Sequence, residues 1–229
     1  MTPAGAGLVR RQISVAPGSR FDGTAGPGGE LWFVIAGSGR LDTGELAGAP
    51  LDRDTGVWIP PGTGYRLQAG PGAEISLDLV SLPAQPEAGH PDTPGTGTPP
   101  DSDARESDAR DIGTPRISAL RDCEVEQTGD RRFRVLLGPG RGCDAATQFL
   151  GEIPPGRAPE HSHPYDEVVL VLSGEGVLHT RGAGRALARG TSVHLPPGLP
   201  HCLENTGTAT LVVLGVFHPG GSPAQKAAG

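Results

Sequence analysis

Glu30 to Thr43 reads ELWFVIAGSGRLDT, and Glu167 to Thr180 reads EVVLVLSGEGVLHT. Glu, Val, Gly, Gly, Leu and Thr recur in step between these two stretches, at an offset of 137 residues. Each stretch is an apolar run of strand length, followed by a Gly-x-Gly turn and a second alternating run, which predicts two strands joined by a tight turn. The chain therefore contains an internal repeat, and the repeated unit is rich in strands.

A second pair of segments extends the repeat. Thr55 to Gly62 reads TGVWIPPG and Thr191 to Gly198 reads TSVHLPPG, at an offset of 136. The chain has 37 Gly and 24 Pro among 229 residues, which favours many short strands and turns over long helices. Two copies of one unit predict an all-β chain with two β-barrels or sandwiches that arose by duplication. The alternative is two similar but unrelated β-meanders.

The repeat also predicts the domain boundaries. The two copies lie in residues 1–83 and 119–219, and the intervening residues 84–118 have almost no large aliphatic side chains but many Pro, Gly, Thr, Asp and Ser. Such a segment cannot bury enough apolar area to order itself, so we expect a flexible linker. The tail, residues 220–229, should also be loose.

The charge of the chain argues against nucleic-acid binding. The formal net charge is −7, from 19 basic and 26 acidic residues. No stripe of basic residues follows any predicted element, as a nucleic-acid interface would require. The densest basic group is interpreted as the solvated face of one strand: Arg131, Arg132 and Arg134.

The sequence also predicts a cytoplasmic protein. No apolar run approaches the roughly 20 residues of a membrane span, and the first eleven residues lack the apolar core of a signal peptide. An odd number of cysteines without paired spacing predicts reduced thiols: Cys123, Cys143 and Cys202. The sequence also leaves open whether the protein forms a homodimer through a barrel face.

The second copy carries a cluster of metal-binding residue types. His161 and His163 are two residues apart, so on a strand their imidazoles share one face. Glu167 follows four residues later, and His201 comes directly after the turn Pro196 to Pro200, where a returning strand could bring it opposite the first pair. Three imidazoles and one carboxylate suit a divalent transition metal. We expect one ion, with Fe(II) as the first candidate and Mn, Ni, Co, Cu or Zn as alternatives.

These residues resemble the two motifs of the cupin superfamily. Gly156-x4-His161-x-His163-x3-Glu167-x6-Gly174 is similar to the first motif, although the family usually has five residues between its opening Gly and first His. Gly190-x5-Pro196-x-Gly198-x2-His201-x3-Asn205 is similar to the second motif at every defined position. The resemblance implies two cupin jelly-roll barrels of six to eight strands each, with a metal inside the C-terminal one.

The first copy departs from this pattern. Alignment of Glu30 with Glu167 places Thr24 and Gly26 where the second copy has histidines, and Tyr65 takes the position of His201. A lone carboxylate does not hold a transition metal tightly, so this barrel should be degenerate and free of metal. The alternative is a metal-free ligand pocket formed by Glu30, Trp32, Trp58 and Tyr65.

Several other residues of the second copy are weaker candidates for the pocket or for catalysis. Besides Glu167, we expect Tyr165 at the mouth of the pocket and His179 as an acid or base facing it, although a half-buried strand histidine is an equal interpretation of His179. Gln148 lines the pocket or points to solvent. Alternation points Cys202 away from the metal.

The donor set leaves the reaction open. Two free coordination positions would permit iron-dependent oxygenation of a small molecule, which makes a non-haem iron dioxygenase-type oxidoreductase the first prediction. The same ligands could polarise a carbonyl in a cupin isomerase, decarboxylase or lyase. A binding module without catalysis is the third alternative.

Overall fold

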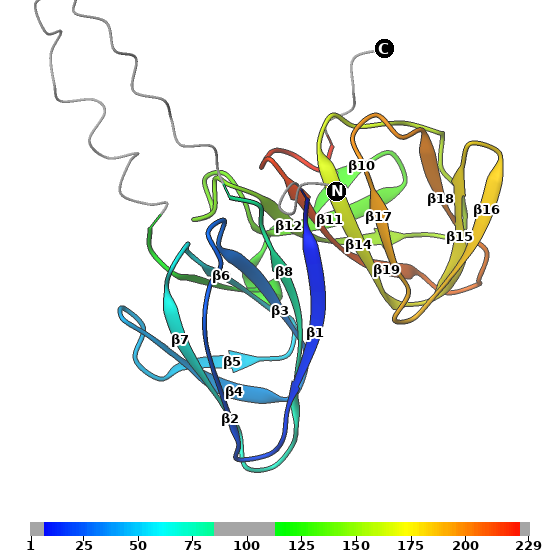
Figure 1. The fold of residues 1–229 in the computed structure, drawn as a ribbon. Helices are drawn as coiled ribbons and strands as arrows, with labels where there is room; N and C mark the ends of the chain where they lie inside the picture. The colour runs from blue at the N-terminus through cyan, green and yellow to red at the C-terminus, as the bar shows by residue number, and fades with distance from the viewer. Residues whose placement is uncertain (1–6, 85–112, 225–229) are drawn as a thin grey trace, which may run out of the picture.

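The computed structural model describes residues 7–84 and 113–224. Its strands form two barrels, one from each copy of the repeat, that pack side by side (Figure 1). The predicted all-β fold with two cupin-like barrels is confirmed. Within the described ranges, the helical content is one short turn, Leu120–Asp122. None of the described helical structure is long and apolar enough to cross a membrane.

The N-terminal barrel consists of two facing sheets. The strand order in the first sheet is β1-β8-β3-β6-β9, and in the second it is β2-β7-β4-β5. The strands are β1 (Val9–Val15), β2 (Arg20–Thr24), β3 (Glu30–Ala36), β4 (Ser38–Thr43), β5 (Ala49–Asp52), β6 (Thr55–Ile59), β7 (Gly64–Ala69), β8 (Ile75–Ser81) and β9 (Arg116–Ala119).

The C-terminal barrel repeats this plan. Its first sheet has the order β10-β11-β12-β19-β14-β17, and its second has the order β13-β18-β15-β16. The strands are β10 (Glu126–Thr128), β11 (Arg131–Leu137), β12 (Thr147–Ile153), β13 (Gly156–Arg157), β14 (Asp166–Ser173), β15 (Glu175–Thr180), β16 (Ala183–Ala188), β17 (Ser192–Leu195), β18 (His201–Asn205) and β19 (Leu211–His218).

The two barrels match in strand register as well as in strand order. Glu30 lies opposite Ile59 on β6, and Glu167 lies opposite Leu195 at the equivalent position of β17. A one-residue irregularity interrupts the pairing at the same point of each copy, near Ile35 and near Leu172. The repeat in the sequence is therefore also a repeat of hydrogen-bonding pattern.

The segment between the barrels differs in part from its expected boundary. Residues 85–112 of the predicted linker lie outside the described part of the chain. Arg116–Ala119, which we assigned mostly to the linker, forms β9 and pairs antiparallel with β6 of the N-terminal barrel. The short run Arg-Ile-Ser-Ala is ordered because it extends a sheet formed sixty residues earlier, and nothing in the local composition signals that partner.

A shared apolar cluster joins the barrels. It takes side chains from the outward face of the first sheet of each barrel, among them Leu31, Phe33, Leu170 and Leu214. The strands β3 and β14 are thus buried on both faces, which explains why their sequences are continuous apolar runs. The buried carboxylate of Asp78 lies on the same face of β8 as the clustered Val80 and forms an ion pair with Arg10 at 2.6 Å.

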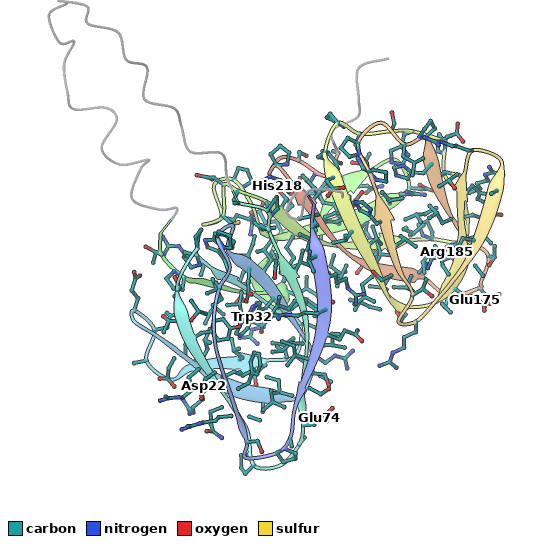
Figure 2. All side chains as sticks on the ribbon, in the orientation of Figure 1. Asp22, Trp32, Glu74, Glu175, Arg185 and His218 are labelled. Atoms are coloured by element: carbon teal, nitrogen blue, oxygen red, sulfur yellow. The ribbon has the colours of Figure 1, made fainter. Side chains whose placement is uncertain are left out.

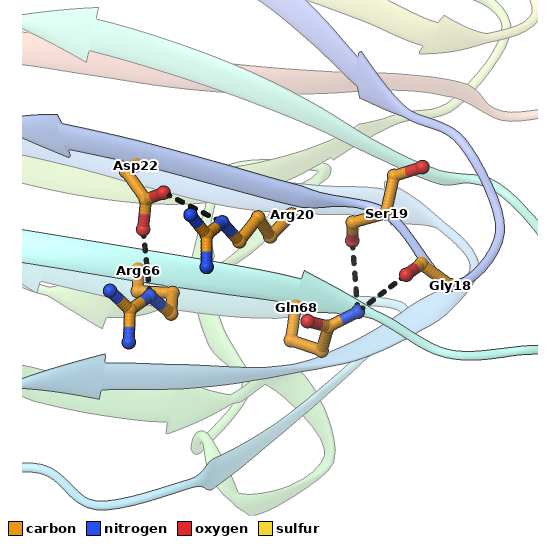
Figure 3. A network of polar contacts seen from close by, with 6 residues as sticks. All are labelled: Gly18, Ser19, Arg20, Asp22, Arg66 and Gln68. Carbon is orange, nitrogen blue, oxygen red and sulfur yellow. Dashed lines mark hydrogen bonds and ion pairs between the residues drawn. The ribbon is translucent and has the colours of Figure 1, made fainter.

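The interior and the outer surface of the N-terminal barrel have opposite character. Trp32 lies inside the barrel among the strands (Figure 2) and is fully buried. On the outside, Asp22 of β2 bridges Arg20 and Arg66, and Gln68 donates to the carbonyls of the β1–β2 turn (Figure 3). The alternation of strand residues thus separates a packed interior from a solvated polar face.

Candidate metal centre in the C-terminal barrel

Three predicted ligands meet inside the C-terminal barrel. One donor atom from each of His163, Glu167 and His201 lies within 4.8 Å of the others, and all three side chains are buried. Two donors on opposite sides of one ion lie about 4 Å apart, given metal–ligand distances of about 2.0–2.2 Å. The spacing of this group therefore fits a single divalent cation, and it is the one such group among the described residues.

The strands determine where these donors point. Glu167 is the second residue of β14 and shares its inward face with Val169 and Val171, which belong to the interior core of the barrel. His201 opens β18 directly after the Pro-Pro-Gly turn, and its backbone exchanges two hydrogen bonds with His161. This backbone bridge holds the two ligand-bearing segments side by side.

Backbone carbonyls set the orientation of the imidazoles. The Nδ1–H of His163 donates to the carbonyl of Tyr165 at 3.0 Å, and that of His201 donates to the carbonyl of Leu199 at 2.8 Å. A carbonyl can only accept, so the proton of each neutral ring lies on Nδ1. The Nε2 lone pair is then left to bind a metal, which is the usual support of a metal-bound histidine.

One buried nitrogen lacks a hydrogen bond. His163 Nε2 is buried and has no partner of hydrogen-bonding geometry, although it lies 2.8 Å from Glu167 Oε2. A buried polar atom left without a partner is costly, and a cation between this nitrogen and the carboxylate would satisfy both. The donor set, with nitrogen and hard oxygen and without thiolate, also fits a divalent metal.

Burial and neighbouring charges act differently on the three rings. Burial lowers the pKa of His201, and burial together with the nearby His201 lowers the pKa of His161, so both rings favour the neutral form that binds metal. Burial also opposes protonation of His163, but the adjacent Glu167 carboxylate outweighs it and raises the pKa of that ring.

His161, the fourth predicted ligand, is near this group without completing it. Its ring centroid lies 4.6 Å from that of His201 and 6.4 Å from that of His163. Its Nδ1 lies 3.3 Å from the carbonyl of Pro159, so this ring has the same carbonyl-facing orientation. The structure brings three of the four predicted donors together and places the fourth beside them.

The donors line a cavity of about 260 Å³. Its walls are mostly apolar and come from β11, β12, β14, β18 and β19, including Phe133, Phe149 and Val213. Tyr165 also lines it, stacked between the rings of His163 and Phe217 at 4.1 Å from each. Burial raises the pKa of Tyr165, so its phenol keeps its proton.

Arg131 lines the same cavity. The interpretation of the basic group as a solvated strand face is wrong for this residue, because it shares the inward face of β11 with Phe133. Arg132 and Arg134 both pair with Glu152, and of these three residues Arg132 and Glu152 also line part of the cavity. Sequence reasoning missed Arg131 because alternation identifies residues that share a face without saying which face is inside.

Other candidates lie away from the cavity. The structure does not bring His179 to it: this side chain pairs with Glu204 at 2.6 Å, while its neighbour Leu178 takes the inward position on β15. Gln148 also lies elsewhere, between the barrels, where its amide donates to the carbonyl of Trp32. Cys202 is buried with its thiol against Arg157, outside the cavity lining.

The N-terminal barrel holds its glutamate differently. Glu30 is buried at the position equivalent to Glu167, and its carboxylate accepts from Trp32 Nε1 at 3.1 Å and from Arg11 at 3.2 Å. Tyr65 packs edge-on against Trp32, with ring centroids 4.7 Å apart. A guanidinium therefore neutralises this carboxylate.

Comparisons with known proteins agree with this architecture. Residues 149–217 match the Cupin domain family model. A structure of Bacillus subtilis oxalate decarboxylase superposes with a TM-score of 0.71 at 18% identity, over 95% of this chain and 70% of that one. The E. coli protein Ylba superposes with a TM-score of 0.69 at 13% identity, over 93% of this chain and 77% of the other.

A further structure of the Bacillus enzyme, described together with its Mn(II) centres, matches with a TM-score of 0.71 at 18% identity, over 96% of this chain and 70% of that one. The search of curated proteins finds no match. At these identities the likeness concerns the fold. Residues 149–217 of the C-terminal barrel thus match the Cupin domain model, and the described chain shares the two-barrel fold of these structures.

Proposed function

We propose that this protein is a metal-dependent enzyme that acts on a small molecule in the cavity of the C-terminal barrel, with chemistry of the decarboxylase or lyase kind. The observation that carries the proposal is the convergence of His163, Glu167 and His201 on one point in the wall of a cavity, with one buried nitrogen left unbonded. A cavity of about 260 Å³ suits a ligand smaller than a typical drug.

His161, His163, Glu167 and His201 would hold the ion. A divalent ion bound there would polarise an oxygen of the substrate as a Lewis acid. Glu167 offsets part of the positive charge, and the carbonyls of Tyr165 and Leu199 keep the imidazoles in place. Tyr165 retains its phenolic proton beside the ligand histidines, so we assign it to donate a hydrogen bond to the bound substrate.

Two considerations favour this chemistry over iron-dependent oxygenation, the first prediction from the sequence. The cavity contains an arginine, which suits a negatively charged substrate, and the fold is shared with a decarboxylase. Nothing in the geometry selects Fe(II), so Mn(II) is the metal to test first, because the Bacillus subtilis oxalate decarboxylase that shares this fold has Mn(II) centres.

The test is turnover of a panel of small carboxylates by protein loaded separately with Mn(II) and Fe(II), in air and under nitrogen. We expect turnover that persists without oxygen and releases carbon dioxide or a cleaved product. The matched control is His163→Gln, which should lose both metal and turnover. Turnover that requires and consumes oxygen would reinstate the oxygenase prediction, and ligand binding without any turnover would indicate a binding module.

A further inference from the structure

Arg131 differs from every other arginine of its strand. Its guanidinium lines the cavity and makes one hydrogen bond, from Nη2 to the carbonyl of Leu203 at 2.9 Å. No carboxylate of the described residues lies within ion-pair distance of it, whereas Arg132 and Arg134 on the same strand both reach Glu152. Arg131 therefore lines the cavity without a carboxylate in direct contact, although the charge of the adjacent Asp130, which also lines the cavity, acts on it.

An unpaired charge at such a position is costly. Burial lowers the pKa of Arg131, which shows that its surroundings disfavour the charged form. An arginine nevertheless stays protonated at any physiological pH. Nη2 is bonded to Leu203, and neither of the other two guanidinium nitrogens is among the buried atoms that lack a partner, so both are accessible to solvent. These donors are free to bind an anion.

The location of Arg131 links this free donor to the metal centre. Leu203, whose carbonyl holds the guanidinium, lies two residues after the ligand His201 on β18, and both residues line the cavity. Phe133 shares the inward face of β11 with Arg131 and contributes an apolar wall. A ligand that fits this arrangement is small, with one anionic group for the guanidinium and a second group that can face the metal ligands.

We propose that Arg131 is the residue that binds the carboxylate of the substrate, which makes small carboxylic acids the substrate class of this site; this inference rests on the proposed function of the C-terminal barrel. A planar guanidinium matches a planar carboxylate through two parallel hydrogen bonds. Arg131 acts as a positioning and specificity residue, because it holds the substrate by a group other than the one that reacts.

The test is calorimetric titration of the full-length protein, loaded with redox-inert Zn(II), with malonate and with its neutral analogue malonamide. Arg131→Met should lower malonate affinity about 10- to 100-fold, the usual effect of losing a charged hydrogen bond, and should leave malonamide binding unchanged. Arg131→Lys should recover part of the loss, because it restores the charge without the planar fork. Arg134→Met, on the same strand but absent from the cavity lining and paired with Glu152, should behave like wild type.

The zinc content of each variant separates this inference from the proposed function. Equal zinc in wild type and Arg131→Met means that any loss of malonate binding is due to the arginine. Wild-type malonate affinity in Arg131→Met would overturn the inference, as would failure of the wild type to bind malonate, or its preference for inorganic phosphate. Arginine-dependent malonate binding without turnover of any carboxylate would instead refute the enzymatic proposal alone.

Discussion

The two barrels have the same strand order and register, yet one interior is packed and the other is hollow. In the N-terminal barrel, Trp32 of β3 lies opposite Leu79 of β8. At the equivalent positions of the C-terminal barrel, Val169 lies opposite Gly215. The first pair is buried in the interior core, whereas Val169 lines the cavity. The loss of bulk at two paired positions creates space beside Glu167.

The adjacent strand shows the same change in size. Ile13 of β1 packs against the interior of the N-terminal barrel, and the equivalent position on β12 is Gly151, which lines the cavity. Because Gly215 has no side chain, the Phe149 ring can lie across it: an added Cβ there would come within 2.3 Å of that ring. Small residues therefore maintain the cavity.

The comparison also shows two ways to stabilise one buried glutamate. Glu30 is neutralised by Arg11 from β1, while the residue equivalent to Arg11 in the C-terminal barrel is Phe149. Without a guanidinium, Glu167 faces the imidazoles of His163 and His201. A buried carboxylate needs a cation close to it, and in the C-terminal barrel that cation would be the metal.

The largest expected effect is a loss of metal when His201 of the second copy is replaced by tyrosine, the residue at the equivalent position of the first copy. His201→Tyr replaces a ligand with the counterpart of Tyr65, and we expect metal content to fall from one ion per chain to near zero, because only two of the three converging donors remain. The barrel should stay folded, since its strands have their own core. Elemental analysis and thermal melts would be measured together. Retention of a full metal complement would contradict the assigned centre.

The next largest effect is a pH dependence of the free energy of unfolding, caused by one buried aspartate of the N-terminal barrel. Asp78 lies between the barrels at the position of Leu214, and burial, opposed by Arg10, raises its pKa from 3.8 to about 6. The folded chain then binds this proton more tightly than the unfolded chain does. Its contribution to stability is therefore present below about pH 4 and is lost as the pH rises toward 6.

Asp78→Asn removes this titration. Relative to the variant, wild type should lose about 2 kcal/mol of unfolding free energy between pH 4 and pH 6, the larger part of the effect of the whole pKa shift. Urea unfolding of both proteins across this range would measure the difference, and titrations that both proteins share would cancel. A difference that stays constant with pH, or that grows in favour of wild type as the pH rises, would exclude this assignment.

Filling the cavity should have a smaller effect on stability. Gly215→Leu introduces the side chain found at the equivalent position of the N-terminal barrel, and an added Cβ alone would lie 2.3 Å from the Phe149 ring and 3.1 Å from Glu167 Oε1. We expect overpacking to cost about 1–3 kcal/mol and metal affinity to fall at least about tenfold as the carboxylate is displaced. Gly72→Leu, in open space on the other barrel, is the control. Unchanged metal affinity would show that the small residue is not needed.

The smallest effect concerns the ion pair of the N-terminal barrel. Arg11→Met leaves Glu30 with Trp32 and Ser81 as partners. Because the Arg11 side chain is 49% exposed, solvent screens the pair, and we expect a loss of about 1 kcal/mol. A double-mutant cycle with Glu30→Gln would isolate the interaction. Metal content should not change, and an effect on it would mean that the barrels are energetically coupled.

Several features followed from the order of residues alone. The apolar runs that begin at Glu30 and Glu167 recur at an offset of 137, which predicted two barrels with matching strands. These runs are recognisable in the sequence because a strand that is buried on both faces must be apolar at nearly every position. The spacing of His163, Glu167 and His201 predicted that these three donors would converge, and they do. The absence of these histidines in the first copy predicts that only the C-terminal barrel holds metal, which stays a prediction.

Only the tertiary structure decided which strand faces are interior. Alternation pairs Arg131 with Phe133 and separates both from Arg132, but the side that becomes the cavity depends on how the second sheet closes over the first. The same ambiguity applied to His179, which the closure of the barrel turns away from the cavity toward Glu204. The place of Arg116–Ala119 depended on an unpaired edge of β6, a partner remote in sequence. Contacts of this kind come from packing between distant segments, which no local pattern encodes.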